Sequence, residues 1–230
     1  MSCLLETHQL GKMDYKTAHE LQRRYQQEVI AQRGIAGSCP FKLLLVEHSP
    51  PVITISRRAS ASQNLLASES ELQKEEIQIC KTDRGGDITY HGPGQLVAYP
   101  IFDLNALSLR LHGYMRFLEG IVIDVLAEFS IQGQRDACAT GVWVEGAKIC
   151  AMGVRVSRWV SMHGFALNIE PNMAHFNTIV PCGLAGRKVT SMQELLENQC
   201  PSLEEVQEVI IEKFELAIAR QDRVQQEHHL

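Results

Sequence analysis

The chain has 230 residues, of which 45% are hydrophobic and 21% are charged, and its formal net charge is -5 at pH 7. This composition is ordinary for a globular protein and argues against a large disordered region. The negative net charge argues against a general nucleic-acid binder, because such domains usually carry net positive charge.

The N-terminal stretch MSCLLETHQLGKMDYK lacks a long apolar run and an Arg/Ser-rich amphipathic pattern, so we expect neither a signal peptide nor a transit peptide. No segment of the sequence reaches the length of a transmembrane helix, and we expect no membrane association. The cysteines number seven, which is odd, and they do not resemble a secreted disulfide framework. We therefore expect a reducing, cytoplasmic setting.

The first half of the chain predicts a helix followed by several strands. Apolar side chains at helical spacing predict a helix over about residues 15–33. The apolar runs FKLLLVEH and PVITIS predict two strands joined by a tight connection at two prolines. SESELQKEE predicts a short helix, and IQICKTD and LVAYPIFDL predict strands on either side of a glycine-rich loop.

The second half predicts a long helix, three more strands and a final helix. The stretch LHGYMRFLEGIVIDVLAEFS predicts an amphipathic helix. Tight turns at Glu145-Gly146 and near Ser157-Arg158 separate three strands. Ser202 and Glu205 form the capping-box pattern before the last helix. The apolar face predicted for the long helix consists of Leu111, Met115, Leu118, Val122, Val125 and Phe129.

This order of helices and strands predicts the α+β class, with a mixed, largely antiparallel sheet flanked by helices. No repeat, low-complexity run or Pro/Ser-rich linker interrupts the chain, so we expect residues 1–230 to form a single domain.

The stretch RGGDITYHGPGQ places glycines at positions 85, 86, 92 and 94, around a Tyr-His pair. Glycines allow a backbone to approach a ligand closely or to adopt positive φ. The spacing of a phosphate-binding loop and the dinucleotide fingerprint are both absent. The residues alone allow two interpretations of this stretch: a ligand-contacting loop, and a β-hairpin whose glycines only satisfy turn geometry.

Metal ligands are not indicated. His91, His112, His163 and His175 are scattered, and the sequence contains neither Cys-x-x-Cys nor His-Glu-x-x-His. These spacings do not predict a zinc site.

Two residues are candidates for nucleophilic chemistry. Cys182 lies in TIVPCGLAG, where neighbouring backbone N-H groups are placed to stabilise an oxyanion; an inert, half-buried thiol is the alternative. Strand alternation puts Lys148 on the same face as Cys150, Met152 and Val154. A lysine there can lower the pKa of a nearby thiol or act as an acid or base, unless it simply extends into water.

Other polar groups lie in apolar or glycine-rich runs and are candidates for binding, with structural hydrogen bonding as the alternative for each. They are Arg84, His91, Arg155, His163 and Asn168.

Four motifs taken together, RGGDITYHGPGQ, GAKICAMGVRV, SMHGFALNI and TIVPCGLAGRKVTS, resemble those of the lipoyl(octanoyl) transferases, also called octanoyl-[acyl carrier protein]:protein N-octanoyltransferases. The resemblance covers residues 43–196. It implies the fold of the biotin/lipoate protein ligase catalytic domain. One departure is Thr54-Ile55-Ser56, where the family usually has Thr-x-Gly.

The resemblance also implies residue roles. Cys182 corresponds to the acyl-thioester nucleophile, and Lys148 to the lysine that lowers its pKa. The substrate-contacting segments carry over to three stretches: Arg84, Gly85, Gly86, Asp87, Ile88, Thr89, Tyr90 and His91; Ala151, Met152 and Gly153; and Gly164, Phe165 and Ala166.

The implied reaction is octanoyl transfer from octanoyl-acyl carrier protein to a lysine of a lipoyl domain, in 2-oxoacid dehydrogenase complexes or the glycine cleavage H protein. It needs no cofactor, metal or nucleotide, and we expect a monomer. An apolar slot for the acyl chain would include Ile88, Met152 and Phe165. The acidic carrier protein would dock on a basic cluster, for which the candidates are Arg23-Arg24, Arg57-Arg58, Arg155 with Arg158, and Arg187-Lys188.

Two alternatives are distinguishable by experiment. An ATP-dependent lipoate or biotin protein ligase shares the implied fold and a comparable lysine, but would require ATP. A noncatalytic module that binds a carrier protein would not respond to loss of Cys182.

Overall fold

The centre of the molecule is a seven-stranded sheet. The computed structural model describes residues 5–35, 37–180 and 186–227. Within these described residues the strand order is β1-β2-β6-β10-β9-β8-β7, in which only β1 and β2 pair in parallel. The strands are β1 (Leu5–Met13), β2 (Phe41–His48), β6 (Gln95–Phe102), β7 (Gln134–Arg135), β8 (Val142–Val144), β9 (Ala147–Ser157) and β10 (Val160–Asn168).

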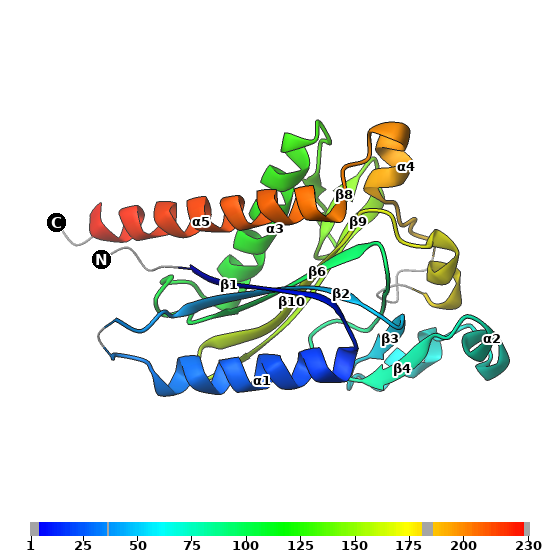
Figure 1. Ribbon diagram of the computed structural model, residues 1–230, viewed down its shortest axis with the longest axis horizontal. Coiled ribbons are helices and arrows are strands. Elements are labelled where there is room, and N and C mark those ends of the chain that lie inside the picture. Colours follow the sequence, from blue (N-terminus) through cyan, green and yellow to red (C-terminus); the bar gives the residue numbers. More distant parts are fainter. Residues whose placement is uncertain (1–4, 36, 181–185, 228–230) are drawn as a thin grey trace.

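Helices cover both faces of this sheet. In Figure 1, α1 (Tyr15–Ala31) lies along one face, and α3 (Leu111–Glu128) and α5 (Leu203–Glu227) lie on the other. The remaining helical segments are short: η1 (Ala61–Asn64), α2 (Glu69–Lys74), η2 (Met173–Thr178), α4 (Met192–Leu196) and η4 (Glu197–Gln199). This arrangement confirms an α+β fold with a mixed, largely antiparallel sheet.

A second, three-stranded sheet stands beyond the end of α1 (Figure 1). Its order is β4-β3-β5, with β4 (Gln78–Lys81) parallel and β5 (Ile88–His91) antiparallel to β3 (Val52–Ile55). The glycine-rich segment Gly92–Gly94 therefore connects β5 in the small sheet to β6 in the large one. The hairpin interpretation of this segment is wrong, because β5 and β6 pair with different strands.

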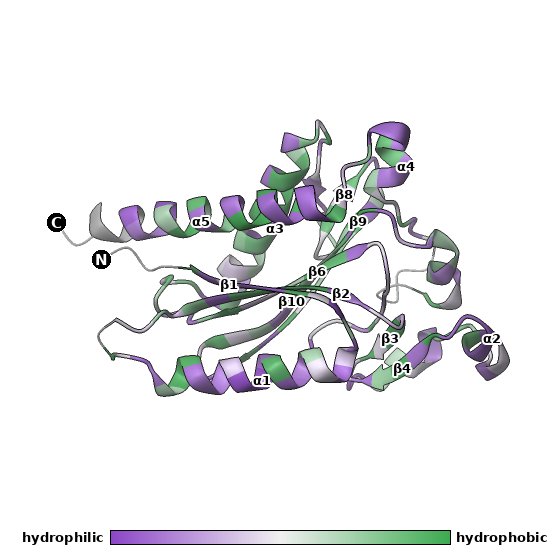
Figure 2. Cartoon of the chain, viewed as in Figure 1, coloured by the Kyte–Doolittle hydropathy of each residue, from purple (hydrophilic) through white to green (hydrophobic). Residues whose placement is uncertain are grey.

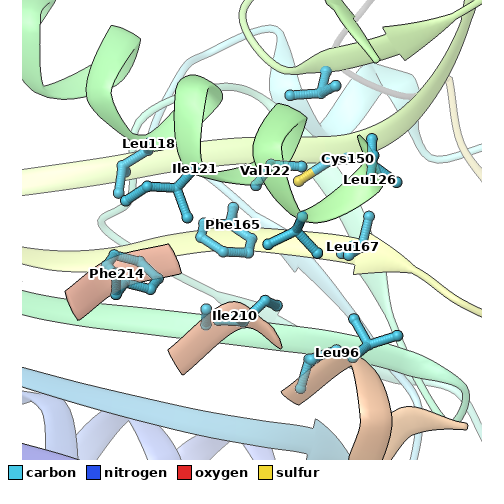
Figure 3. Packing of buried hydrophobic residues seen from close by; sticks show 14 of the residues in the cluster. Leu96, Leu118, Ile121, Val122, Leu126, Cys150, Phe165, Leu167, Ile210 and Phe214 are labelled. Atoms are coloured by element: carbon cyan, nitrogen blue, oxygen red, sulfur yellow. The ribbon is translucent and has the colours of Figure 1, made fainter. Parts of the chain in front are cut away.

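Two apolar clusters hold the helices on the large sheet. Figure 3 shows the cluster under α3 and α5, where Phe214 of α5 and Val122 of α3 pack toward Phe165 of β10. The rings of Phe165 and Phe214 stack with centroids 6.2 Å apart. On the opposite face, Ala18 and Val29 of α1 pack on the sheet. Burial of such side chains is the main stabilising contribution to a fold of this kind.

Hydropathy follows this layering. The outer helices α1 and α5 alternate between hydrophilic and hydrophobic residues, as Figure 2 shows.

Asp14 caps α1 by accepting hydrogen bonds from the backbone N-H groups of Lys16 and Thr17. Within the described residues, no helix combines the length and apolarity needed to cross a bilayer.

Most predicted elements are confirmed, including the helix capped by Ser202, which accepts from Glu205 N while Glu205 accepts from Ser202 N. The two-residue turns Glu145-Gly146 and Arg158-Trp159 have positive φ at both positions, the geometry that matches the twist of a hairpin. One detail of the predicted apolar face is wrong. Leu111 is 51% exposed, because it lies in the first turn of α3 beyond the edge of the core.

Candidate active site

A pocket lies where the loop before β5 meets the large sheet. Ten of the fourteen substrate-contacting residues predicted from the sequence line it, together with Tyr15, Val97, Tyr99 and His163. Those ten are Arg84, Gly86, Thr89, His91, Ala151, Met152, Gly153, Gly164, Phe165 and Ala166. Five stretches of the sequence therefore converge on one cavity: Tyr15, residues 84–91, residues 97–99, residues 151–153 and residues 163–166.

The alternation of β5 decides which residues of this strand reach the pocket. Thr89 and His91 line it, whereas Ile88 and Tyr90 point into the core of the small sheet. Ile88 therefore does not form part of an apolar slot in the described structure, contrary to the prediction. Gly85 and Asp87 are likewise not among the described residues that line the pocket.

Glycines allow the loop to lie directly against β9. The backbone N-H of Gly85 donates to the carbonyl of Val154 at 3.0 Å. A Cβ on Gly153 would lie 2.5 Å from the Gly85 carbonyl oxygen, and one on Gly164 would lie 2.1 Å from that of Ala98. Both contacts are too short for any other residue, so glycine at these positions is required by the close approach of backbones that shapes the pocket.

Arg84 ties the loop to the small sheet. Its guanidinium donates to the hydroxyl and carbonyl of Thr54 at 2.8 to 3.1 Å, and to the carbonyl of Asp87 at 3.2 Å. The backbone N-H of Ser56 also donates to the Asp87 carbonyl. The departure at Thr54-Ile55-Ser56 therefore falls where β3 contacts this loop.

Asp83 gathers positive and imidazole groups at the edge of the pocket. His163 lies 2.9 Å and Arg155 3.0 Å from its carboxylate, and His19 lies 3.5 Å away. The hydrogen bond from His163, aided by Arg155, holds the pKa of Asp83 well below its usual range. The ligand atoms of His19, Asp83 and His163 lie within 4.8 Å of one another, but the carboxylate is already paired with a guanidinium, which disfavours a cation there.

The rings of Tyr15, His91 and Tyr99 line the pocket beside α1, and the buried ring of His48 contacts all three. His48 donates from Nδ1 to the Met13 carbonyl and accepts from the Tyr99 hydroxyl at 2.7 Å. The rings of His48 and His91 lie 5.6 Å apart, and Tyr15 stacks parallel to His91. Burial lowers the pKa of His48 to about 4, so its imidazole is neutral at neutral pH.

Lys148 lies at the start of β9 and is 5% exposed. Its ammonium stands 4.8 Å from the ring centroid of Trp143, and the guanidinium of Arg187 stands 4.0 Å from the same ring. Arg187 is in turn paired with Asp136. The ring of Trp143, 1% exposed, thus fixes the position of the Lys148 side chain by packing and by cation–π attraction.

Cys182 lies outside the described residues, as does the rest of 181–185. The described residues that flank this segment are paired with the body of the protein. Val180 N donates to the carbonyl of Asn64, and Thr190 N donates to the carbonyl of Lys148. Lys148 N also donates to the carbonyl of Lys188 at 2.8 Å. The chain that follows 181–185 therefore pairs directly with the backbone of Lys148.

Three contributors to the pocket were missed by the sequence reasoning. Tyr15 comes from the first turn of α1, and Val97 and Tyr99 come from the β6 strand, which was predicted as a strand but not as a binding element. Their alternate spacing on β6 was the only signal in the sequence, and it is equally typical of a core face. His163 was considered as a binding candidate and does line the pocket.

Comparison with known proteins places this geometry in a family. Residues 14–215 match the family model described as lipoyl protein ligase A/B catalytic domain. The chain is 48% identical over 202 residues to an octanoyltransferase of Gloeobacter violaceus, covering 87% of this chain and 84% of that protein. It is 43% identical over 222 residues to an octanoyltransferase of Christiangramia forsetii, covering 92% of this chain and 94% of the relative.

Solved structures share the fold at much lower identity. A crystal structure of lipoate-protein ligase A bound with ATP superposes with a TM-score of 0.72 at 13% identity, covering 95% of this chain and 86% of that one. A biotin protein ligase from Aquifex aeolicus in complex with biotin and ATP superposes with a TM-score of 0.57 at 12% identity, covering 94% and 71%. This likeness confirms the catalytic-domain fold of biotin and lipoate protein ligases.

Proposed function

The chain belongs to the octanoyltransferase family of lipoyl protein ligase A/B catalytic domains, and on this premise we propose that it transfers an octanoyl group from octanoyl-acyl carrier protein to a lysine of a lipoyl domain. In this proposal residues 1–230 form a single catalytic domain, and the enzyme is a monomer. The acceptors are the lipoyl domains of 2-oxoacid dehydrogenase complexes and the glycine cleavage H protein.

The observation that carries the proposal is the pocket. It brings together residues of the three segments that the sequence motifs predicted for substrate contact. Val97, Met152, Phe165 and Ala166 give it apolar walls suited to an acyl chain. Arg84 and His91 supply polar groups beside those walls.

The reaction proceeds through an acyl-enzyme on Cys182. The thiolate attacks the thioester carbon, a new C–S bond forms, the original C–S bond breaks, and the carrier protein leaves as a thiolate. The lysine amine of the lipoyl domain then attacks the same carbon. The C–N bond forms, the C–S bond breaks, and its electron pair returns to the Cys182 sulfur.

Lys148 activates Cys182 in this proposal. Its backbone pairs with Lys188, Val189 and Thr190, which follow the segment 181–185 in the sequence. In this proposal the positive charge of Lys148 favours the Cys182 thiolate. Lys148 gives its proton to the leaving carrier thiolate, and the resulting neutral amine then accepts a proton from the incoming lysine. A thioester is already activated, so the transfer requires no nucleotide.

The carrier protein docks on Arg57 and Arg58. In the other three basic clusters predicted for docking, Arg23 and Arg155 pair with Asp83, and Arg187 pairs with Asp136. Arg57 and Arg58 are exposed and follow directly after β3 of the small sheet. An acidic partner attracted to these charges would bind less tightly as salt is added.

Transfer without ATP tests the proposal against a ligase. The purified protein, octanoyl-acyl carrier protein and an unmodified lipoyl domain are mixed, and the mass of the lipoyl domain is followed. We expect one octanoyl group on the domain, formed at wild-type rate by the control Lys74→Met, which changes an exposed lysine of α2, and lost in Lys148→Met. Modification that requires ATP and free octanoate, or a fully active Lys148→Met variant, would overturn the proposal.

A further inference from the structure

A chain of buried amides lies behind His91. His91 Nδ1 is 2.8 Å from Oε1 of Gln95, and Nε2 of Gln95 donates to Oδ1 of Asn168 at 2.9 Å. Nδ2 of Asn168 donates to the carbonyl of Thr190 at 2.9 Å. The exposed fractions of His91, Gln95 and Asn168 are 6%, 1% and 4%, so water does not compete with these hydrogen bonds.

The orientation of both amides is determined by backbone carbonyls, which only accept hydrogen bonds. Asn168 must direct its NH₂ group toward the Thr190 carbonyl, which leaves its oxygen facing Gln95. Nε2 of Gln95 also lies 3.4 Å from the Tyr90 carbonyl, so two acceptors fix the Gln95 amide. Oε1 of Gln95 therefore faces His91, and His91 must donate from Nδ1.

A neutral imidazole that carries its proton on Nδ1 has a lone pair on Nε2. His48 shows the same arrangement, with Nδ1 donating to the Met13 carbonyl, and its Nε2 is used by the Tyr99 hydroxyl. His91 differs in that no hydrogen bond to its Nε2 is formed within the described part of the chain. Because His91 lines the pocket, this lone pair is placed for a ligand.

We propose that Gln95 and Asn168 are positioning residues that hold His91 in the Nδ1–H tautomer, so that Nε2 accepts a hydrogen bond from an N–H of the substrate amine in the pocket. The inference rests on the proposed function for the identity of that amine. The tautomer itself follows from the hydrogen-bond geometry alone.

Burial lowers the pKa of His91 well below its usual value, and the neighbouring His48 acts in the same direction. The ring is therefore a weak base that orients an N–H group without taking its proton. Removal of the proton stays with Lys148. The same hydrogen-bond chain ends at Thr190, whose N-H donates to the Lys148 carbonyl, so the orienting group and the lysine are held by one buried network.

Nitrogen NMR of the protein without substrate tests the tautomer directly. Histidine labelled with ¹⁵N gives one pyrrole-type and one pyridine-type signal for each fixed neutral ring, and the spectrum of His91→Asn identifies the pair that belongs to His91. We expect Nδ1 to carry the proton and Nε2 to be pyridine-type. A proton on Nε2, or averaged signals from two tautomers, would overturn the proposal whatever the protein's substrate is.

The variant Gln95→Leu tests the positioning role, with Gln26→Leu as the matched control. Gln26 is also buried and donates to one backbone carbonyl, that of Val160, far from His91 in sequence. We expect Gln95→Leu to release the tautomer and to lower the maximal rate of transfer to the lipoyl domain about tenfold, as expected for one lost hydrogen bond. The rate at which octanoyl is loaded onto Cys182 should fall less than the rate of transfer to the lipoyl domain.

Gln26→Leu should retain both the His91 signals and the rate. If Gln95→Leu kept the wild-type tautomer, or if the two variants lost the same activity, Gln95 would be only a structural residue. Failure of octanoyl transfer by the wild-type protein would contradict the proposed function instead, and would leave the wild-type tautomer result standing.

Discussion

Acidification should destabilise this protein through His48, and the effect can be calculated. His48 is fully buried, and its pKa in the folded state is lowered by burial from an ordinary 6.5 to about 4. Because the folded-state pKa is lowered, the unfolded chain binds the proton first. The stabilisation is therefore complete above the unfolded pKa and is lost as the pH falls from 6.5 toward 4.

Between about pH 7 and about pH 5, proton binding to the unfolded form of this one histidine lowers the free energy of unfolding by about 2 kcal/mol. The variant His48→Asn removes this contribution while its side-chain amide can still reach the Met13 carbonyl. It leaves the Tyr99 hydroxyl without its acceptor, which costs about 1–3 kcal/mol at every pH.

The assay is urea unfolding of both proteins across that pH range. We expect His48→Asn to be less stable at neutral pH but to lose about 2 kcal/mol less than wild type on acidification. The half-buried His19 and the buried His163, whose pKa values are not shifted by His48, contribute equally to both proteins and cancel in the difference. An equal loss of stability in the two proteins would refute the argument.

Two further predictions follow from the site. Gly153→Ala places a Cβ 2.5 Å from the Gly85 carbonyl oxygen and should cost about 1–3 kcal/mol of stability by urea unfolding, together with most of the activity. Gly120→Ala lies inside α3, where the added Cβ would meet only the end of the Arg135 side chain at 3.5 Å, and it should instead raise the free energy of unfolding by about 0.5–1 kcal/mol. A change of the same sign in both variants would contradict the close-approach argument. Trp143→Leu should slow acyl loading about two- to thirtyfold, because it removes the ring that holds Lys148. Trp143→Phe should retain most of the rate. Equal rates in the two variants would show that the aromatic face is not needed.

The elements that the sequence predicted well are those whose signals are local. The α5 helix begins at a capping box, and the turns at Glu145-Gly146 and Arg158-Trp159 separate apolar strands of regular length. The strand β1 was missed because LETHQLGKM is mostly polar and only partly buried, and Gly11 interrupts it with positive φ. An edge strand of this kind lacks the apolar pattern that reveals a central strand.

The site was predictable only in part, because the sequence signals are local and the pocket forms where separate elements meet. The family motifs indicated three segments, and the structure brings residues from all three to one pocket. They did not indicate that Ile88 turns away from it or that Tyr15 and Tyr99 complete it, since both facts depend on how two sheets and α1 meet. The assignment of Cys182 as nucleophile stays a prediction, because it lies outside the described residues.

The most direct measurement of the central claim is the intact mass of the protein after mixing with octanoyl-acyl carrier protein in the absence of ATP. Cys182→Ala is compared with wild type and with Cys138→Ala, which removes an exposed cysteine. We predict that wild type and Cys138→Ala each gain one octanoyl group, which a lipoyl domain then removes, and that Cys182→Ala gains none. An octanoyl adduct on Cys182→Ala, or transfer to the lipoyl domain by that variant at the wild-type rate, would contradict the account.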